Sequence, residues 1–117
     1  MKFALLIYGD ENAWRSLAEA DQAKMYAEHE VFGKWLAEKG WIRGGEELDA
    51  SERAATVKAK GGGFVVSDGP FAETKEQLGG FYLIECDSRA EAIEAAKRLP
   101  AAAVEVRPVV EAEQRPG

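Results

Sequence analysis

The chain has 117 residues, of which 31% are charged, and its formal net charge is −6 at pH 7. This length favours a single domain whose core needs no disulfide bond or metal ion for stability. The acidic balance argues against a nucleic-acid partner, which requires a basic face, and no apolar run approaches the roughly 20 residues of a membrane-spanning helix.

The first part of the chain predicts a strand, a long helical region and a second strand. An apolar run at 2–8 ends at a Gly-Asp pair, which is typical of a strand before a turn. The helical region covers about 13–39 and is stopped by a glycine, while a second start signal near Ala20-Asp21 indicates a break within it. A strand at about 41–47 follows.

The middle of the chain predicts a β-hairpin. The segments 55–60 and 64–67 flank three glycines at 61–63, and these lack the Lys and the following helix of a phosphate-binding loop. Further on, Thr74 is followed three residues later by Gln77, which is a capping-box pattern. This pattern predicts a one-turn helix that the next two glycines end.

The last part predicts a strand, a helix and an edge strand. The strand covers 80–87, and Ser88 with Glu91 forms a capping box for a helix at 89–99. A final strand at 104–109 contains a proline, which is typical of a sheet edge.

Without the hairpin, the order of elements is β-α-β-β-α-β, which predicts an α+β fold of ferredoxin-like type with an inserted β-hairpin. The strands at 2–8 and 80–87 should be central because they are the most apolar runs. We expect a single domain at 1–110 and a flexible polar C-terminal tail at 111–117.

The cysteine content indicates the compartment. Cys86 is the only cysteine, so it cannot form an internal disulfide bond, and its apolar surroundings suit a small buried side chain. No secretory signal is visible, since the apolar run at 3–8 is too short for one. These observations predict a cytoplasmic protein.

Both central strands are apolar on both faces, although helices should cover only one face of the sheet. In the first strand, one side carries Phe3 and Leu5, and the other carries Leu6 and Tyr8. The second apolar face needs a cover, and a second copy packed sheet to sheet provides one, so we predict a homodimer. The alternative is a monomer whose hairpin folds over this face.

The single histidine lies on the apolar side of the long helix. Met25, His29, Phe32 and Leu36 form one narrow stripe at helical spacing. His29 is therefore a candidate general acid or base at the floor of a pocket between helix and sheet. The alternative is a core imidazole that hydrogen-bonds a backbone carbonyl.

The segment 68–80 combines turn signals with charge. Asp68-Gly69-Pro70 predicts a turn, and the charged residues that follow flank the apolar Phe71. The charged residues of the segment are Asp68, Glu73, Lys75 and Glu76. They could line the mouth of a pocket, or they could belong to a hydrated loop.

This segment, read as Asp-Gly-Pro-Phe-Ala-Glu-Thr-Lys-Glu-Gln-Leu-Gly-Gly, resembles the signature of the DGPF-domain proteins of the YCII-related superfamily. The opening residues 2–10 and the closing residues 104–108 resemble that family as well. The resemblance implies a bacterial protein that forms dimeric α+β barrels. It implies no known reaction, although many DGPF proteins resemble gene neighbours of sigma factors, so a sigma-factor association is implied by resemblance only.

In the wider superfamily a histidine of the first helix, together with an aspartate, has been suggested as an active site. His29 matches the helix position, and Asp68 is the natural acid partner. By simple spacing after the histidine, Glu38 is a rival for the role of Asp68.

Three interpretations of function follow from these observations. The first is a cofactor-free acid/base enzyme for a small molecule, since no metal-ligand set or nucleophile motif is present. The candidate pocket residues are Tyr8, His29, Phe32, Phe71 and Tyr82, with Asp68 as the orienting acid and Glu73 and Lys75 as further contacts. The second is a non-catalytic ligand-sensing or protein-interaction module. The third is a purely structural dimer with an empty pocket.

Overall fold

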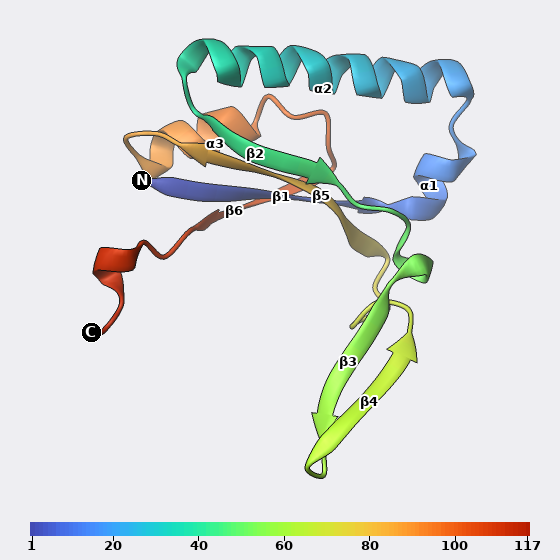
Figure 1. Ribbon diagram of the computed structural model, residues 1–117. Coiled ribbons are helices and arrows are strands. Elements are labelled where there is room, and N and C mark those ends of the chain that lie inside the picture. The colour runs from blue at the N-terminus through green and yellow to red at the C-terminus, as the bar shows by residue number, and fades with distance from the viewer.

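The computed structural model describes residues 1–117 and has a four-stranded antiparallel sheet at its centre. The elements in chain order are β1 (Lys2–Asp10), α1 (Glu11–Ser16), α2 (Glu19–Lys39), β2 (Ile42–Glu47), η1 (Ser51–Arg53), β3 (Ala55–Lys60), β4 (Gly63–Asp68), β5 (Glu76–Glu85), α3 (Arg89–Ala96), β6 (Ala103–Pro108) and η2 (Ala112–Gln114), where η1 and η2 are 3-10 turns. The strand order is β2-β5-β1-β6, and α2 and α3 cover the same face (Figure 1). The predicted ferredoxin-like α+β fold is confirmed, with β1 and β5 in the centre.

The pairing of β1 with β5 sorts the apolar residues onto two faces. Phe3 pairs with Ile84 and faces the helices, whereas Leu6 pairs with Phe81 and faces away from them. We call the side away from α2 and α3 the outer face. Its apolar residues on the two central strands are Ala4, Leu6, Tyr8, Leu78, Phe81 and Leu83. The sheet is therefore apolar on both sides, as the alternation predicts.

The hydrophobic core lies between the sheet and the two helices. Its largest fully buried side chains are Phe3, Leu5, Leu36 and Ile84. Burial of one such side chain stabilises the fold by about 1.5–3 kcal/mol. Helix α2 ends at Gly40, which has φ of 72° and supplies the left-handed conformation of a helix C-cap. The stripe of α2 that ends at Leu36 is thereby held over the sheet.

The helical region after β1 differs from the predicted one. Helix α1 begins at Glu11, because the Asp10 carboxylate accepts a hydrogen bond of 2.9 Å from the backbone N–H of Asn12 and so caps the helix. The break lies at 17–18, a few residues before the predicted position.

Strand β5 begins at Glu76, so the predicted one-turn helix at Thr74 is wrong. Leu78 pairs with Tyr8 of β1, and Gly80 pairs with both Ile7 of β1 and Glu47 of β2. Gly79 is the extra residue of a bulge, where the register shifts between Ile7 and Tyr8. The Gln77 side chain donates to the carbonyl of Thr74 at 2.9 Å, so the capping-box pair stabilises a loop rather than a helix. Strand pairing with β1 from Glu76 onward therefore overrides the local capping-box signal.

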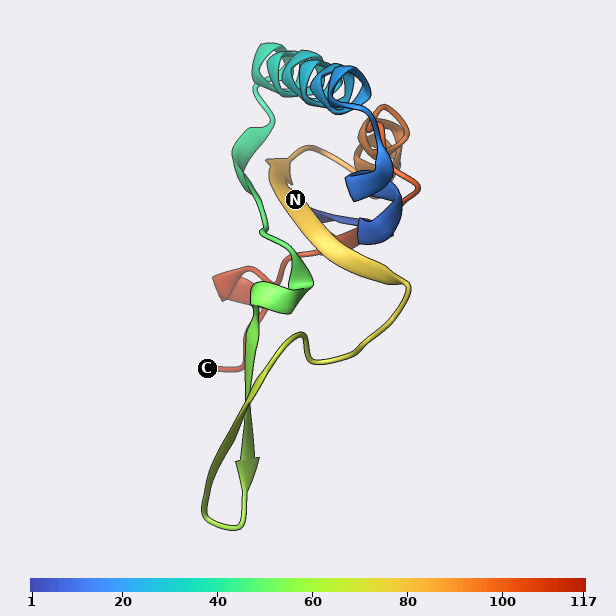
Figure 2. The ribbon, with the colours of Figure 1, turned by 90° about the vertical axis from the view of Figure 1, so that its right-hand side faces the viewer.

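Two segments extend from the body on the outer side of the sheet (Figure 1). One is the hairpin of β3 and β4, which forms a sheet of its own and projects as an arm (Figure 2). The other is the C-terminal tail with η2. The predicted flexibility of the tail stays a prediction. None of the helices is both long and apolar enough to cross a membrane.

Candidate functional site

Helix α2 places His29 directly over strand β5. The half-buried imidazole lies with Nδ1 at 3.0 Å from the hydroxyl oxygen of Tyr82, and the two rings are within 11° of parallel. His29 belongs to the inner stripe of α2, and Tyr82 points to the same layer because it alternates with the outward Phe81 along β5. The helical and strand periodicities thus bring two polar aromatic groups together.

Packing fixes the orientation of this pair. The ring of Phe32 meets the ring of Tyr82 edge to face, with centroids 5.0 Å apart. Opposite Tyr82 on β2 stands Gly45, where a side-chain Cβ would lie 3.2 Å from Cδ1 of Tyr82. The glycine therefore leaves the space that the tyrosine ring occupies.

Burial favours the neutral form of both members of the pair. Desolvation lowers the pKa of His29 below its usual 6.5, although the negative charges of Glu47 and Glu28 act in the opposite direction. Desolvation also raises the pKa of the Tyr82 hydroxyl. Since no protein group hydrogen-bonds Nε2 of His29, this atom is the free end of the pair. Nε2 accepts a proton when Nδ1–H donates to Tyr82, and it donates one in the other tautomer.

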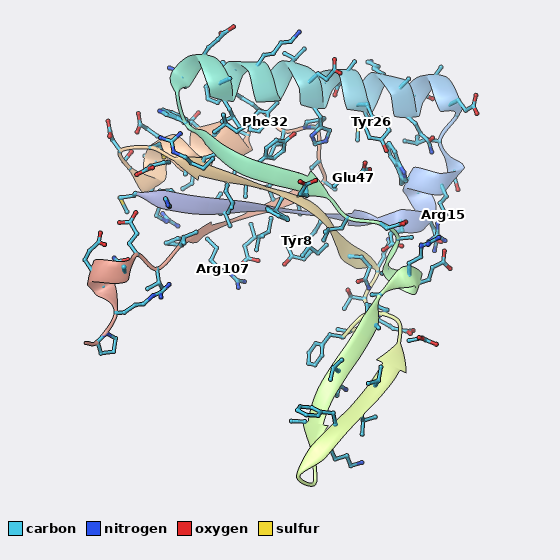
Figure 3. The ribbon with its side chains drawn as sticks, viewed as in Figure 1. Tyr8, Arg15, Tyr26, Phe32, Glu47 and Arg107 are labelled. Atoms are coloured by element: carbon cyan, nitrogen blue, oxygen red, sulfur yellow. The ribbon has the colours of Figure 1, made fainter.

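A second polar pair lies one turn earlier on α2. The Tyr26 hydroxyl donates to the Glu47 carboxylate at 2.8 Å, and this bond raises the pKa of Tyr26. Trp14 supports the Tyr26 ring edge to face, with centroids 5.5 Å apart. Tyr26 and Phe32 point from α2 toward the sheet, with Glu47 beneath them (Figure 3). Glu47 is the carboxylate whose charge acts most on His29.

Glu47 was not among the site residues expected from the sequence. The feature that places Glu47 in the site is the pairing of β2 with β5, which sets Gly45 beside Tyr82. Glu47 is two residues further along β2, so it faces the helix as well. Asp68 and Glu38, the two acids considered from the sequence, form no hydrogen bond or ion pair with His29.

Three of the four charged residues of the segment 68–80, namely Asp68, Glu73 and Lys75, line a separate groove of about 720 Å³, whereas Glu76 does not. This groove lies between the segment, the junction of β1 with α1, and η1. Its lining residues are Asp10, Glu11, Asn12, Arg15, Ser51, Glu52, Asp68, Gly69, Pro70, Glu73, Thr74, Lys75 and Gln77. On the far wall, Glu11 accepts from the backbone N–H of Ser51 at 3.0 Å and pairs with Arg15 at 3.1 Å. These bonds tie the β1–α1 junction to η1.

The residues predicted for one pocket are thus distributed over several places. The structure brings His29, Phe32 and Tyr82 together. Tyr8 is on the outer face, where its hydroxyl donates to Glu105 at 3.3 Å, and Figure 3 shows it on the side of the sheet away from α2. Phe71 is 77% exposed and lies near the Lys58 ammonium.

Potential metal ligands do not gather at either place. The structure contains no group of three or more His, Cys, Asp or Glu side chains that could hold a metal ion. Cys86 is buried in the core, and desolvation raises the pKa of its thiol. His29 and Tyr82 offer hydrogen-bonding atoms, and an imidazole can also transfer a proton.

The fold and this site define the protein as a ferredoxin-like α+β protein with a neutral histidine–tyrosine pair beneath its long helix. The sequence profile of the family described as YCII-related domain matches residues 1–113, and the chain belongs to this family. An uncharacterised protein of Rhizobium meliloti (strain 1021) is 36% identical to it over 114 residues, which cover 93% of this chain and 92% of the relative.

Proposed function

We propose that the protein binds a small molecule beneath helix α2 and transfers a proton to or from it through His29, without a cofactor. The observation that carries this proposal is the neutral His29–Tyr82 pair, whose Nδ1 to hydroxyl distance is 3.0 Å and whose Nε2 has no protein partner. A base must be unprotonated at working pH, and the lowered pKa of His29 supplies that form near pH 7.

The chemistry follows from the two nitrogens. Nε2 takes a proton from a substrate C–H or O–H group that a neighbouring carbonyl or aromatic ring acidifies, and the imidazolium returns the proton at another position. During this step Nδ1–H donates to the Tyr82 oxygen, which holds the ring in place. The carboxylate that we assign to stabilise the imidazolium is Glu47 rather than Asp68, because the charge of Glu47 raises the pKa of His29.

The proposal includes a homodimer of the dimeric α+β barrel type. Support comes from the outer face, where Leu78 and Leu83 are 36% and 37% exposed beside Leu6 and Phe81. A contiguous apolar patch of this kind marks an interaction surface. A second copy, packed sheet to sheet, would cover it. The single buried Cys86 fits a cytoplasmic location in the same proposal.

A ligand screen with matched variants tests the site. We would measure thermal unfolding of the wild type, His29→Gln and Glu30→Gln against a library of small carbonyl and aromatic acids. Glu30 is the adjacent, exposed residue of α2 and serves as the control. We expect compounds that raise the midpoint of wild type and Glu30→Gln but not of His29→Gln. If the His29→Gln protein responds to every compound as the wild type does, the assignment of His29 is wrong.

A second function is favoured by one observation. Phe64 on the arm of β3 and β4 is 76% exposed, and an exposed apolar side chain of this kind suits a non-catalytic protein-interaction module. A partner such as a sigma factor would then use this surface, and His29 would have a packing role only. Turnover separates the two functions, since a ligand that binds but is never deuterated at any C–H position in D₂O favours the non-catalytic module.

A further inference from the structure

The β3–β4 hairpin is an arm that its own chain does not cover. The two strands pair only with each other, as a sheet separate from the central one. The arm gives the chain a radius of gyration of 16.6 Å, whereas a compact domain of this length has roughly 13 Å. Gly61 and Gly62 have φ of 57° and 80° and form the tight turn at its tip, which matches the twist of the strands.

The register of the hairpin makes it amphipathic. Val57 pairs with Val66 and Ala59 pairs with Phe64, so these four residues share one face, which we call the apolar arm face. The opposite face carries Thr56, Lys58, Lys60, Val65 and Ser67. On the apolar arm face the exposed fractions are 60% for Val57, 76% for Phe64 and 66% for Val66.

Such an arm requires a partner surface. An isolated two-stranded hairpin is only marginally stable in water, because neither face is buried. Phe64 and two of the three valines of the hairpin lie on one face and both lysines lie on the other, which is the pattern of a hairpin that packs on one side and meets water on the other. The apolar arm face therefore identifies the side that docks.

We propose that the arm is exchanged between two copies of this chain, with its apolar face packed on the outer side of the partner. This inference rests on the homodimer of the proposed function. The arm projects from the same side of the sheet as the uncovered outer face (Figure 1), so a copy seated on that face meets the arm.

The exchange is reciprocal in a twofold dimer, so each arm residue contributes twice. A substitution on the apolar arm face removes two contacts from the dimer, and one on the opposite face removes none. The residues Val65 and Val66 are neighbours in β4 and face opposite sides. They therefore provide a matched pair for the same substitution.

The test combines sedimentation with hydrogen exchange of the full chain. We would determine the dimer dissociation constant of wild type, of Phe64→Ser combined with Val66→Thr, and of Val65→Thr. We expect the double variant to weaken association on the order of a hundredfold, and Val65→Thr to change it by less than about threefold. In wild type, the amides at 55–68 should be protected from hydrogen exchange at protein concentrations above the dissociation constant, and they should lose this protection on dilution.

The outcomes distinguish the arm from the dimer and from the site. The wild type could form a stable dimer in which the amide hydrogens at 55–68 exchange with solvent as fast as in the diluted monomer. This result overturns the exchange of arms between copies and leaves the sheet-to-sheet dimer. A wild type that is monomeric at all concentrations overturns both. The His29 assignment is decided independently by the ligand screen, since the arm variants leave α2 and β5 unchanged.

Discussion

The two adjacent glycines of β2 allow a sharp test of the site geometry. Gly45 faces the helices opposite Tyr82, and Gly44 faces the outer side opposite Leu83. A Cβ at Gly45 would lie 2.8 Å from the carbonyl oxygen of Phe81 and 3.2 Å from the Tyr82 ring. A Cβ at Gly44 would meet only Cδ1 of Leu83, at 3.7 Å, which is an ordinary contact.

The expected free energies follow from these distances. Gly45→Ala forces the strand and the Tyr82 ring apart, and overpacking of this kind costs about 1–3 kcal/mol. Loss of backbone freedom in the unfolded chain offsets about 0.4–1 kcal/mol of this cost. Gly44→Ala receives the same entropic gain without the clash, so it should be neutral or slightly stabilising. The two variants should differ by about 2 kcal/mol, which is roughly a 30-fold difference in the folded-to-unfolded ratio.

Urea unfolding measured by circular dichroism gives the free energies of both variants and of the wild type. An NMR titration of the His29 imidazole then reports the site, because displacement of the Tyr82 ring should change the titration in Gly45→Ala but not in Gly44→Ala. Equal stabilities of the two variants within about 0.5 kcal/mol would refute the packing of Tyr82 against Gly45. An unchanged titration in a destabilised Gly45→Ala would refute the link to the pair.

Three further predictions concern pH, capping and thiol reactivity. Burial lowers the pKa of His29, so the unfolded state binds more protons than the folded state as the pH falls through 6.5. The stability advantage of wild type over His29→Gln, measured by urea unfolding, should therefore shrink from pH 8 to pH 5. A constant difference would contradict this. Ser88 accepts a hydrogen bond from the Glu91 N–H at 3.2 Å, so Ser88→Ala should cost about 1 kcal/mol in the same assay, whereas Ser88→Asp should retain most of the stability. Burial raises the pKa of the Cys86 thiol, so iodoacetamide at pH 8 should modify the native protein roughly tenfold or more slowly than the urea-unfolded chain, and similar rates would show an accessible thiol.

The fold was predictable because the apolar patterns of the strands and of the long helix predict the same arrangement. Two-sided apolar runs identified the central strands, and the stripe of Phe32 and Leu36 identified the inner face of α2, where both residues are buried. The prediction was wrong at Thr74 because a capping box is a local signal. Strand β5 pairs with β1 from Glu76 onward and also with β2 from Gly80 onward, and this pairing outweighs one turn of helix.

The candidate site was predictable only in part, for a geometric reason. The periodicity of α2 identified His29, and the alternation of β5 turned Tyr82 toward the same layer. The acidic partner depends on the register between β2 and β5, which no local pattern determines, so Glu47 was missed. Asp68 is the last residue of β4, at the base of the arm, and its direction depends on how the hairpin leaves the sheet.

Strand β5 carries the site on one side and the proposed interface on the other. Tyr82 faces His29, whereas Phe81 and Leu83 face outward, and a slip of one residue would exchange these sides. The register of β5 must therefore be fixed for both purposes. Gly80 contributes to this, because a Cβ there would lie 3.0 Å from the carbonyl oxygen of Glu46 on β2. A glycine usually weakens a strand, but here its missing side chain permits the close approach that holds Tyr82 beneath the helix.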